Sequence, residues 1–177
     1  MKNIFTFLLI AITTVTFAQD NPEQTTDSTE VTEQSTNLPT ITLKDIDGND
    51  VNIADYGVNG KITVISFWAT WCKPCIKELK NMNELLDDWA DDYNVEIVAI
   101  SVDDSRNMNK VKPFASGMGW NFDVLMDPNG ELQRAMNVAN PPVTFLIDQD
   151  GNIVYTHTGY VEGDEYELEE HIIEASH

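Results

Sequence analysis

The chain contains two cysteines, and only two residues separate them, in the segment Trp71-Cys72-Lys73-Pro74-Cys75. An apolar run typical of a buried strand precedes this segment, and an amphipathic pattern typical of a helix follows it. Cys72 therefore falls at a helix N-terminus, where unpaired backbone N–H groups and the helix dipole stabilise a thiolate. The thiolate is the species that attacks in disulfide exchange. Cys75 lies one turn later on the same face, so it can attack a mixed disulfide formed by Cys72 and release the partner.

Two other uses of a cysteine pair at this spacing are weaker. A purely structural disulfide that closes so short a loop would constrain little of the entropy of the unfolded chain. A zinc site would need two further ligands, and the three histidines, His157, His171 and His177, have no paired ligand spacing. We therefore expect no metal and no bound cofactor, and a redox-active disulfide between Cys72 and Cys75.

The elements around the cysteines can be predicted from residue patterns. Two short alternating segments, residues 41–44 and 51–53, flank Asp47-Gly48 and predict a β-hairpin. Residues 62–68 are apolar on both faces, which predicts a buried central strand. Apolar residues then recur at steps of three and four up to Tyr93, which predicts a helix of about five turns. Pro74 fits the first turn of this helix, because its missing N–H would be unpaired there.

Strands and helices continue to alternate towards the C-terminus. The patterns predict a buried strand at 95–102, a helix at about 106–117, a strand at 122–126, a short helix at 131–137, an antiparallel strand pair at 143–147 and 153–157, and a last helix at 164–175. We therefore predict an α/β fold with a central mixed β-sheet flanked by helices.

Composition limits the classes of partner. The chain has 177 residues, of which 42% are hydrophobic, and this length and composition suit one globular domain. Its 10 Lys+Arg and 30 Asp+Glu give a net charge of −20, which argues against nucleic acid and anionic lipid as partners. One cation and five acids precede residue 39, which leaves −16 on residues 39–177. The acidity therefore belongs to the predicted domain.

The N-terminal residues predict export. Residues 1–18 have the pattern of a signal peptide, with Lys2, an apolar stretch and a small residue at Ala18. The stretch is shorter than the ~20 residues of a spanning helix, and an uncleaved membrane anchor is the alternative. Residues 19–38 are acidic, rich in Thr, Ser and Glu, and too poor in apolar residues to fold, so we predict a disordered linker, with a glycosylated stalk as the alternative. The expected location is outside the cytoplasm, in a bacterial periplasm.

The segment Phe67-Trp68-Ala69-Thr70-Trp71-Cys72-Lys73-Pro74-Cys75 resembles the active-site segment of thioredoxin-like proteins. More narrowly, it resembles the exported TlpA/ResA type of thiol-disulfide oxidoreductase. The similarity runs from about residue 39 to residue 175. It includes the leading hairpin and a strand-helix unit inserted at residues 122–137. The resemblance implies a thioredoxin-like fold for residues 39–177.

A second segment, Asn140-Pro141-Pro142-Val143-Thr144-Phe145, resembles the cis-proline segment of this family. The resemblance implies that the peptide bond before Pro142 is cis and that Pro142 faces the disulfide. It also implies that the backbone of Pro141 pairs with an incoming substrate chain. An ordinary loop leading into a strand is the alternative, since only a small minority of X–Pro bonds are cis.

A candidate acid follows the cysteines. Ser66 stands where thioredoxin carries a buried acid, and Glu78 matches the acid position of the TlpA/ResA branch. The resemblance implies that the Glu78 carboxylate takes up or returns a proton near Cys75 during exchange. The alternative is an acid near the start of the helix that only interacts with the helix dipole. At Lys80 the chain departs from the family pattern, which often has proline there.

The other candidates surround the cysteines. We expect Trp68 in the core, and Trp71, Lys73 and Pro74 on the surface that binds the substrate together with Pro141 and Pro142. Three lysines, at positions 73, 77 and 80, share one flank of the predicted helix. They either form a solvated surface paired with acids such as Glu84, or a positive rim that stabilises the Cys72 thiolate and admits acidic partners.

The favoured function is a dithiol-disulfide oxidoreductase that reduces disulfides in exported proteins. The resemblance implies that these substrates include apocytochrome c and that a membrane thiol carrier supplies the electrons. We also expect the protein to be monomeric. No histidine lies between Cys72 and Cys75, so a strongly oxidising design is not supported. One alternative is a peroxiredoxin-like thiol peroxidase, which the insertion at 122–137 would suit. The other is a non-enzymatic interaction domain with incidental cysteines.

Overall fold

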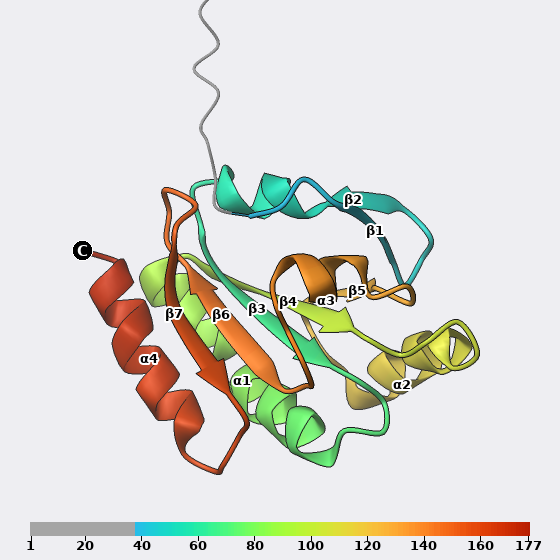
Figure 1. Cartoon of the computed structure of the whole chain (residues 1–177). Helices are drawn as coiled ribbons and strands as arrows, with labels where there is room; N and C mark the ends of the chain where they lie inside the picture. The colour runs from blue at the N-terminus through green and yellow to red at the C-terminus, as the bar shows by residue number, and fades with distance from the viewer. Residues whose placement is uncertain (1–37) are drawn as a thin grey trace, which may run out of the picture. The chain divides into compact units, whose positions relative to one another are not determined.

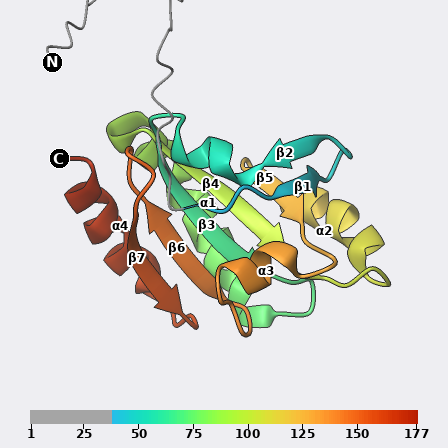
Figure 2. The same cartoon turned by 45° about the horizontal axis from the view of Figure 1, so that its top comes forward.

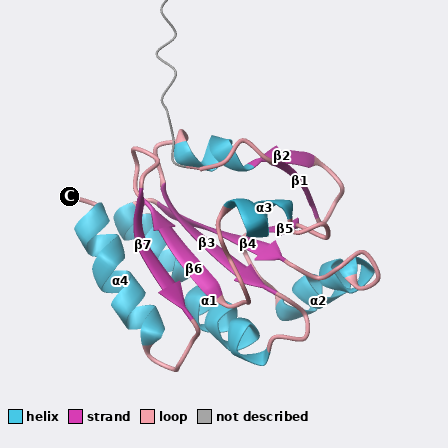
Figure 3. Cartoon of the chain, viewed as in Figure 1, coloured by secondary structure: helices cyan, strands magenta, loops and turns pink. Residues whose placement is uncertain are grey.

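A seven-stranded mixed sheet forms the centre of the computed structural model, which describes residues 38–177 (Figure 1). The strand order is β2-β1-β5-β4-β3-β6-β7. The strands are β1 (Thr42–Asp45), β2 (Asp50–Asn52), β3 (Ile62–Trp68), β4 (Val95–Ser101), β5 (Asp123–Met126), β6 (Val143–Ile147) and β7 (Ile153–Thr158). Strands β3, β4 and β5 are parallel, and β6 runs antiparallel to β3. This is the predicted thioredoxin-like α/β fold, with the N-terminal hairpin β1–β2 and the inserted β5–α3 unit (Figure 3).

Helices cover both faces of the sheet and give it two cores (Figure 2). The helical elements are η1 (Ile53–Gly57), α1 (Lys73–Tyr93), η2 (Met108–Lys110), α2 (Val111–Met118), α3 (Glu131–Ala135) and α4 (Asp164–Ala175). One core packs α1, α2 and α4 against the sheet, and the other packs η1 and α3 against the opposite face. Strand β3 is buried along its whole length because it supplies side chains to both cores, which explains its unbroken apolar run.

Helix α1 extends from the cysteines to the far end of the sheet. Its buried face includes Leu79, Met82, Leu86 and Trp89, which are the positions expected from the apolar periodicity. The helix ends at Asn94, whose left-handed backbone, with φ 58°, brings its N–H to the carbonyls of Ala90 and Trp89. The long packed helix therefore holds its N-terminal turn at a fixed place beside the end of β3.

The predicted helix at 106–117 is wrong at its start. Residues 108–110 form the 3₁₀ turn η2, and the α-helix begins at Val111. A helix continuous from 106 would bring the Pro113 ring against the carbonyl of Asn109 and would lack one hydrogen bond. Because the helix begins at Val111, Pro113 lies in its first turn, where the backbone nitrogen needs no hydrogen-bond acceptor within the helix. The Asp104 carboxylate accepts from the backbone N–H groups of Arg106 and Asn107, which favours a turn before the helix.

Two smaller differences also have local causes. Helix α3 ends at Ala135, two residues before the predicted end. Asn137 has a φ of 56°, a left-handed backbone conformation that is incompatible with continuation of the α-helix. Leu38, which we placed at the end of the linker, is 5% exposed and packs in the core on the η1 side. Leu38 therefore contributes to the core of the domain that follows it.

The predicted signal peptide and the rest of the linker lie outside the described residues. Within residues 38–177 no helix is both long enough and apolar enough to cross a membrane.

Candidate active site

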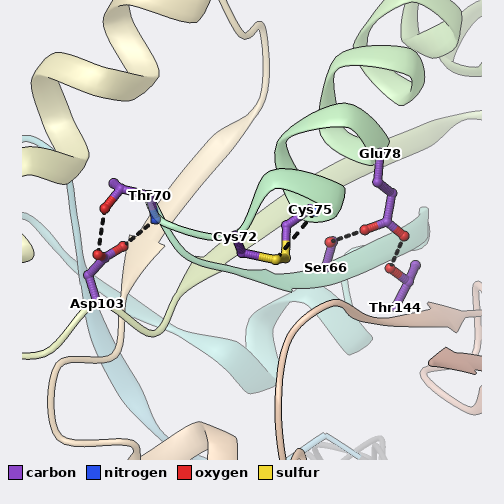
Figure 4. The surroundings of a disulfide bond; sticks show 7 residues. All are labelled: Ser66, Thr70, Cys72, Cys75, Glu78, Asp103 and Thr144. Carbon is purple, nitrogen blue, oxygen red and sulfur yellow. Dashed lines mark hydrogen bonds between the residues drawn. A yellow bond between two sulfur atoms is a disulfide. The ribbon is translucent and has the colours of Figure 1, made fainter. Parts of the chain in front are cut away.

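The two cysteines form a disulfide where β3 passes into α1 (Figure 4). Cys72 is the N-cap residue of α1, and its Sγ accepts a hydrogen bond from the backbone N–H of Cys75 at 3.4 Å. Cys75 is fully buried, and Cys72 is 5% exposed. The sulfur of Cys72 thus occupies the position where helix N–H groups stabilise a negative charge. This arrangement can stabilise a Cys72 thiolate and keep Cys75 beneath it as an internal nucleophile.

The residues around the disulfide present both apolar and charged side chains to solvent. Trp71 is 63% exposed, although it is a large aromatic residue, and Lys73 and Pro74 are exposed beside it. Trp68, in contrast, is fully buried and packs edge-to-face on Trp120 with ring centroids 4.8 Å apart. The expected separation of the two tryptophans into one surface residue and one core residue is therefore confirmed. The substrate-binding role of Trp71, Lys73 and Pro74 stays a prediction.

Glu78 is a buried acid one helical turn after Cys75. It is 5% exposed, and its two carboxylate oxygens accept hydrogen bonds from Thr144 Oγ1 at 2.7 Å and from Ser66 Oγ at 3.3 Å (Figure 4). Ser66 and Thr144 are directly paired across β3 and β6, and both side chains reach the same carboxyl group. Residues three apart on a helix are neighbours, so Glu78 lies on the Cys75 side of α1.

Burial is the main reason why the pKa of the Glu78 carboxyl is raised. Desolvation raises the pKa of this carboxyl from 4.5 to about 7, and the negative charges of Asp164 and Glu165 act in the same direction. The hydrogen bonds from Thr144 and Ser66 lower the pKa and offset part of this effect. Glu78 also lies beyond the first turn of α1, which contains no acid. A carboxyl that titrates near neutral pH is suited to exchanging a proton with a nearby thiol.

The predicted cis-proline segment leads into β6. The Pro141–Pro142 peptide bond is cis, Pro142 is buried, and Val143 begins the strand. Two residues further on, Thr144 donates its hydrogen bond to Glu78. The same strand thus contributes the cis bond and one of the two partners of the buried acid. That Pro142 faces the disulfide and that Pro141 pairs with a substrate chain stay predictions.

A second buried carboxylate, which sequence reasoning missed, holds the loop before the cysteines. Asp103 is 1% exposed and accepts hydrogen bonds from the Thr70 backbone N–H at 2.8 Å, from Thr70 Oγ1 at 2.6 Å and from Ser101 Oγ at 2.9 Å. Thr70 directly precedes Trp71, so Asp103 ties the active-site loop to the end of β4 (Figure 4). The available signal was topological, because the ends of adjacent parallel strands lie at the same edge of a sheet.

Replacing Asp103 with asparagine is expected to lower the free energy of unfolding by about 1–3 kcal/mol, because a buried amide cannot accept all three of these hydrogen bonds. The measurement is urea denaturation. Asp88→Asn makes the same chemical change at an exposed position and is the control. Its effect on the free energy of unfolding should stay within about 0.5 kcal/mol. Equal losses in the two variants would show that the Thr70–Asp103 contacts do not stabilise the fold.

The structure pairs two of the three lysines on α1 with acids. Lys80 Nζ lies 3.6 Å from Glu84 Oε1, which is the expected surface pair, and Lys77 Nζ lies 2.6 Å from Glu162 Oε2 in the loop after β7. Among residues 38–177 no carboxylate lies within ion-pair distance of Lys73. Lys73 is therefore the one lysine of the three whose positive charge is not balanced by a paired carboxylate in residues 38–177.

Replacing Lys73 with glutamine is expected to slow exchange with an acidic peptide disulfide by up to about fivefold, since one exposed charge contributes at most about 1 kcal/mol. Lys80→Gln, the matched change in an already paired lysine, should leave the rate unchanged. The second-order rate constant at low and at high salt measures both effects, and the Lys73 effect should shrink at high salt. If both variants behave like the unmodified protein, the lysines are only solvated surface.

The structure offers no built metal site in the part of the chain that it describes. Among residues 38–177, no three His, Cys, Asp or Glu side chains are grouped so that they could hold an ion. His157 lies on β7, and its Nε2 is 3.1 Å from Asp164 Oδ2.

Comparison with known proteins agrees with this geometry. The model of the AhpC/TSA family matches residues 35–156 of the chain. The thiol-disulfide oxidoreductase ResA of Geobacillus kaustophilus is 37% identical over 134 residues, which are 76% of this chain and 74% of that protein. ResA of Bacillus subtilis is 33% identical over 126 residues, which are 71% of this chain and 68% of that protein.

Solved structures show the same relationship. An uncharacterized thioredoxin-like protein from Porphyromonas gingivalis is 47% identical with a TM-score of 0.70, over 78% of this chain and 91% of that one. A putative thiol:disulfide interchange protein DsbE from Chlorobium tepidum is 28% identical with a TM-score of 0.70, over 79% of this chain and 95% of that one. A peroxiredoxin Q from Xanthomonas campestris, at 20% identity and a TM-score of 0.67, shares the fold alone. The chain therefore belongs to the AhpC/TSA family of thioredoxin-like proteins, and within it to the ResA-type thiol-disulfide oxidoreductases.

Proposed function

We propose that this oxidoreductase is an extracytoplasmic protein-disulfide reductase in which Cys72 is the nucleophile, Cys75 resolves the mixed disulfide and Glu78 transfers the proton of Cys75. The observation that carries the proposal is the placement of the three groups along one helix. Cys72 caps α1 directly after an exposed tryptophan, Cys75 is buried, and Glu78 is a buried acid with a pKa of about 7 one turn further on.

The proposed reaction begins with the reduced dithiol. The Cys72 thiolate attacks one sulfur of the substrate disulfide, and the other substrate sulfur leaves as a thiolate. Glu78 accepts the proton of Cys75, whose thiolate then attacks Cys72 Sγ. The bond between Cys72 and the substrate breaks, the second substrate thiolate leaves, and the Cys72–Cys75 disulfide forms. Two electrons thus pass from the dithiol to the substrate, and no further cofactor is needed.

The direction of electron flow and the partners are part of the proposal. Disulfides in exported proteins, apocytochrome c among them, would be the substrates, and a membrane thiol carrier would reduce the Cys72–Cys75 disulfide again. Support comes from the predicted signal peptide, from the ResA relatives and from the absence of a histidine between the cysteines. We also propose that the domain acts as a monomer, without nucleic acid.

The test compares two oxidised substrates. The reduced protein is mixed with insulin, whose interchain disulfides report protein-disulfide reduction, and separately with hydrogen peroxide, and dithiothreitol serves as the electron source in both. The proposal predicts rapid precipitation of insulin and peroxide consumption no faster than the dithiothreitol blank. Peroxide consumption without insulin reduction would favour a thiol peroxidase. Neither activity would favour an interaction domain with incidental cysteines.

A further inference from the structure

A small cavity lies on the α1 side of the sheet, where β6, β7 and α4 come together behind Glu78. Its free volume is about 10 Å³, which is the room needed by one water molecule. Two apolar side chains, Met82 and Leu168, form part of the wall. The remaining lining is polar and is contributed by Glu78, Thr144, Tyr155, His157, Tyr160, Asp164 and Glu165. A water in such a site would find the two to four polar partners that buried waters need.

Glu78 is one of the residues that line this cavity. Each catalytic cycle requires this group to release a proton that it has taken from Cys75, yet the side chain is only 5% exposed. Its two hydrogen-bond partners do not lead to solvent, because Ser66 is fully buried and Thr144 is 1% exposed. The proton therefore needs another exit, and the cavity is the space that the carboxyl shares with other titratable groups.

His157 on β7 also lines the cavity. Its side chain is 29% exposed, so it reaches both the cavity and solvent. Nε2 lies 3.1 Å from Asp164 Oδ2, and Nδ1 lies 3.2 Å from the Tyr155 hydroxyl. Both ring nitrogens are thus engaged, and imidazole can accept a proton at one nitrogen and release it from the other at neutral pH.

We propose that one water in this cavity links the Glu78 carboxyl to the His157–Asp164 pair and that His157 carries the proton of Glu78 to solvent. When Cys75 has passed its proton to Glu78, the carboxyl gives a proton to the water while the water gives one to Asp164, which shares it with Nε2 of His157. The imidazolium then gives up the proton of Nδ1 to the Tyr155 hydroxyl, which passes its own proton to the exposed Glu167 carboxylate and so to solvent, and no electrons move. Reduction of the disulfide uses the same steps in reverse. The inference rests on the proposed role of Glu78 as the proton acceptor of Cys75.

The groups that face His157 are acids and hydroxyls. Helix α4 faces the cavity with Asp164 and Glu165, and Glu167 lies 3.2 Å from the Tyr155 hydroxyl that bonds the imidazole. Strands β3 and β6 contribute only the hydroxyls of Ser66 and Thr144 to Glu78. Among residues 38–177, the lining of this cavity includes no lysine or arginine.

The test follows the proton at Glu78 directly. Infrared spectroscopy after a rapid pH jump monitors the carboxylic acid C=O band, which Glu78→Gln assigns by its disappearance. His157→Ala is expected to slow the protonation of Glu78 by at least about tenfold, and imidazole added to the solution should restore the rate. His157→Gln keeps hydrogen-bonding groups toward Tyr155 and Asp164 but cannot carry a proton, so it should be slow as well.

His171→Ala is the matched control. His171 lies on α4 and stacks on the same Tyr155 ring, with centroids 4.1 Å apart, but it does not line the cavity. Its variant should keep the unmodified rate. Unchanged protonation in both His157 variants, or a slow rate that imidazole does not restore, would overturn the inference. The readout reports proton movement at Glu78 whether or not the carboxyl serves Cys75, so failure of the route and failure of the proposed reductase role are distinguishable.

Discussion

Cys72→Ser is expected to lower the rate of protein-disulfide reduction by at least about 10³-fold, since a hydroxyl cannot replace the attacking thiolate. The fold should survive, because serine is a favoured N-cap residue and can accept the hydrogen bond that the Cys72 sulfur accepts from the Cys75 N–H. Cys75→Ser has the opposite phenotype. Cys72 can still attack, but no internal thiol releases the partner, so mixed disulfides accumulate. Non-reducing electrophoresis of the cell envelope, followed by reduction, measures this accumulation.

The double variant Cys72→Ser/Cys75→Ser is the control for this trapping experiment, and it should capture no partner. Cys72→Ser alone should also capture none, because buried Cys75 has no access to a substrate. Capture through Cys75 in place of Cys72 would reverse the assigned roles. A Cys75→Ser variant that traps no protein at any level would contradict the assignment of protein substrates.

Glu78→Gln is expected to make the protein more stable and less active. The folded-state pKa of about 7 lies above the ordinary value of 4.5, so between these pH values the folded protein holds a proton that the unfolded chain has lost. Stability therefore falls as the pH rises through this window, and above pH 7 the ionised, buried carboxylate costs about 3 kcal/mol. Glutamine removes this cost, so the free energy of unfolding should increase by up to about 3 kcal/mol above pH 7 and change little below pH 4.5.

Activity should move in the other direction. Without a carboxyl to accept the Cys75 proton, the release of the mixed disulfide at neutral pH should slow by about 10²-fold. Stopped-flow measurements across this pH range, combined with urea denaturation at the same pH values, give both effects. Glu84→Gln is the matched control, because Glu84 lies on the same helix but is exposed and paired with Lys80. Equal stability changes in both variants would show that burial of Glu78 is not their cause.

The sequence predicted those features that depend on neighbouring residues. The apolar runs and turns located the strands, and the three- and four-residue periodicity located α1. The cysteine spacing placed Cys72 at the helix N-terminus, where the structure has it. Helix α2 was misplaced because the pattern was extended across Pro113, whose position already argued for a later start.

The features that the sequence did not reveal depend on contacts between distant residues. Thr144 and Glu78 are 66 residues apart, and they meet only because β6 pairs with β3 beneath α1. Asp103 reaches Thr70 across 33 residues for a similar reason. The resemblance to the TlpA/ResA type indicated the acid at Glu78, but the burial that raises its pKa follows from the packing of α1 against the sheet. Tertiary contacts of this kind have no local signal in one sequence.

The reduction potential of the Cys72–Cys75 couple tests the central claim most directly. Equilibration of the protein with thiol-disulfide buffers gives the potential and the number of electrons transferred. We predict a single two-electron transition near that of thioredoxin, about −270 mV, which suits a reductant of protein disulfides. A potential near about −120 mV, as in the strong oxidant DsbA, would contradict the reductase assignment, because such a dithiol would pass electrons to few protein disulfides.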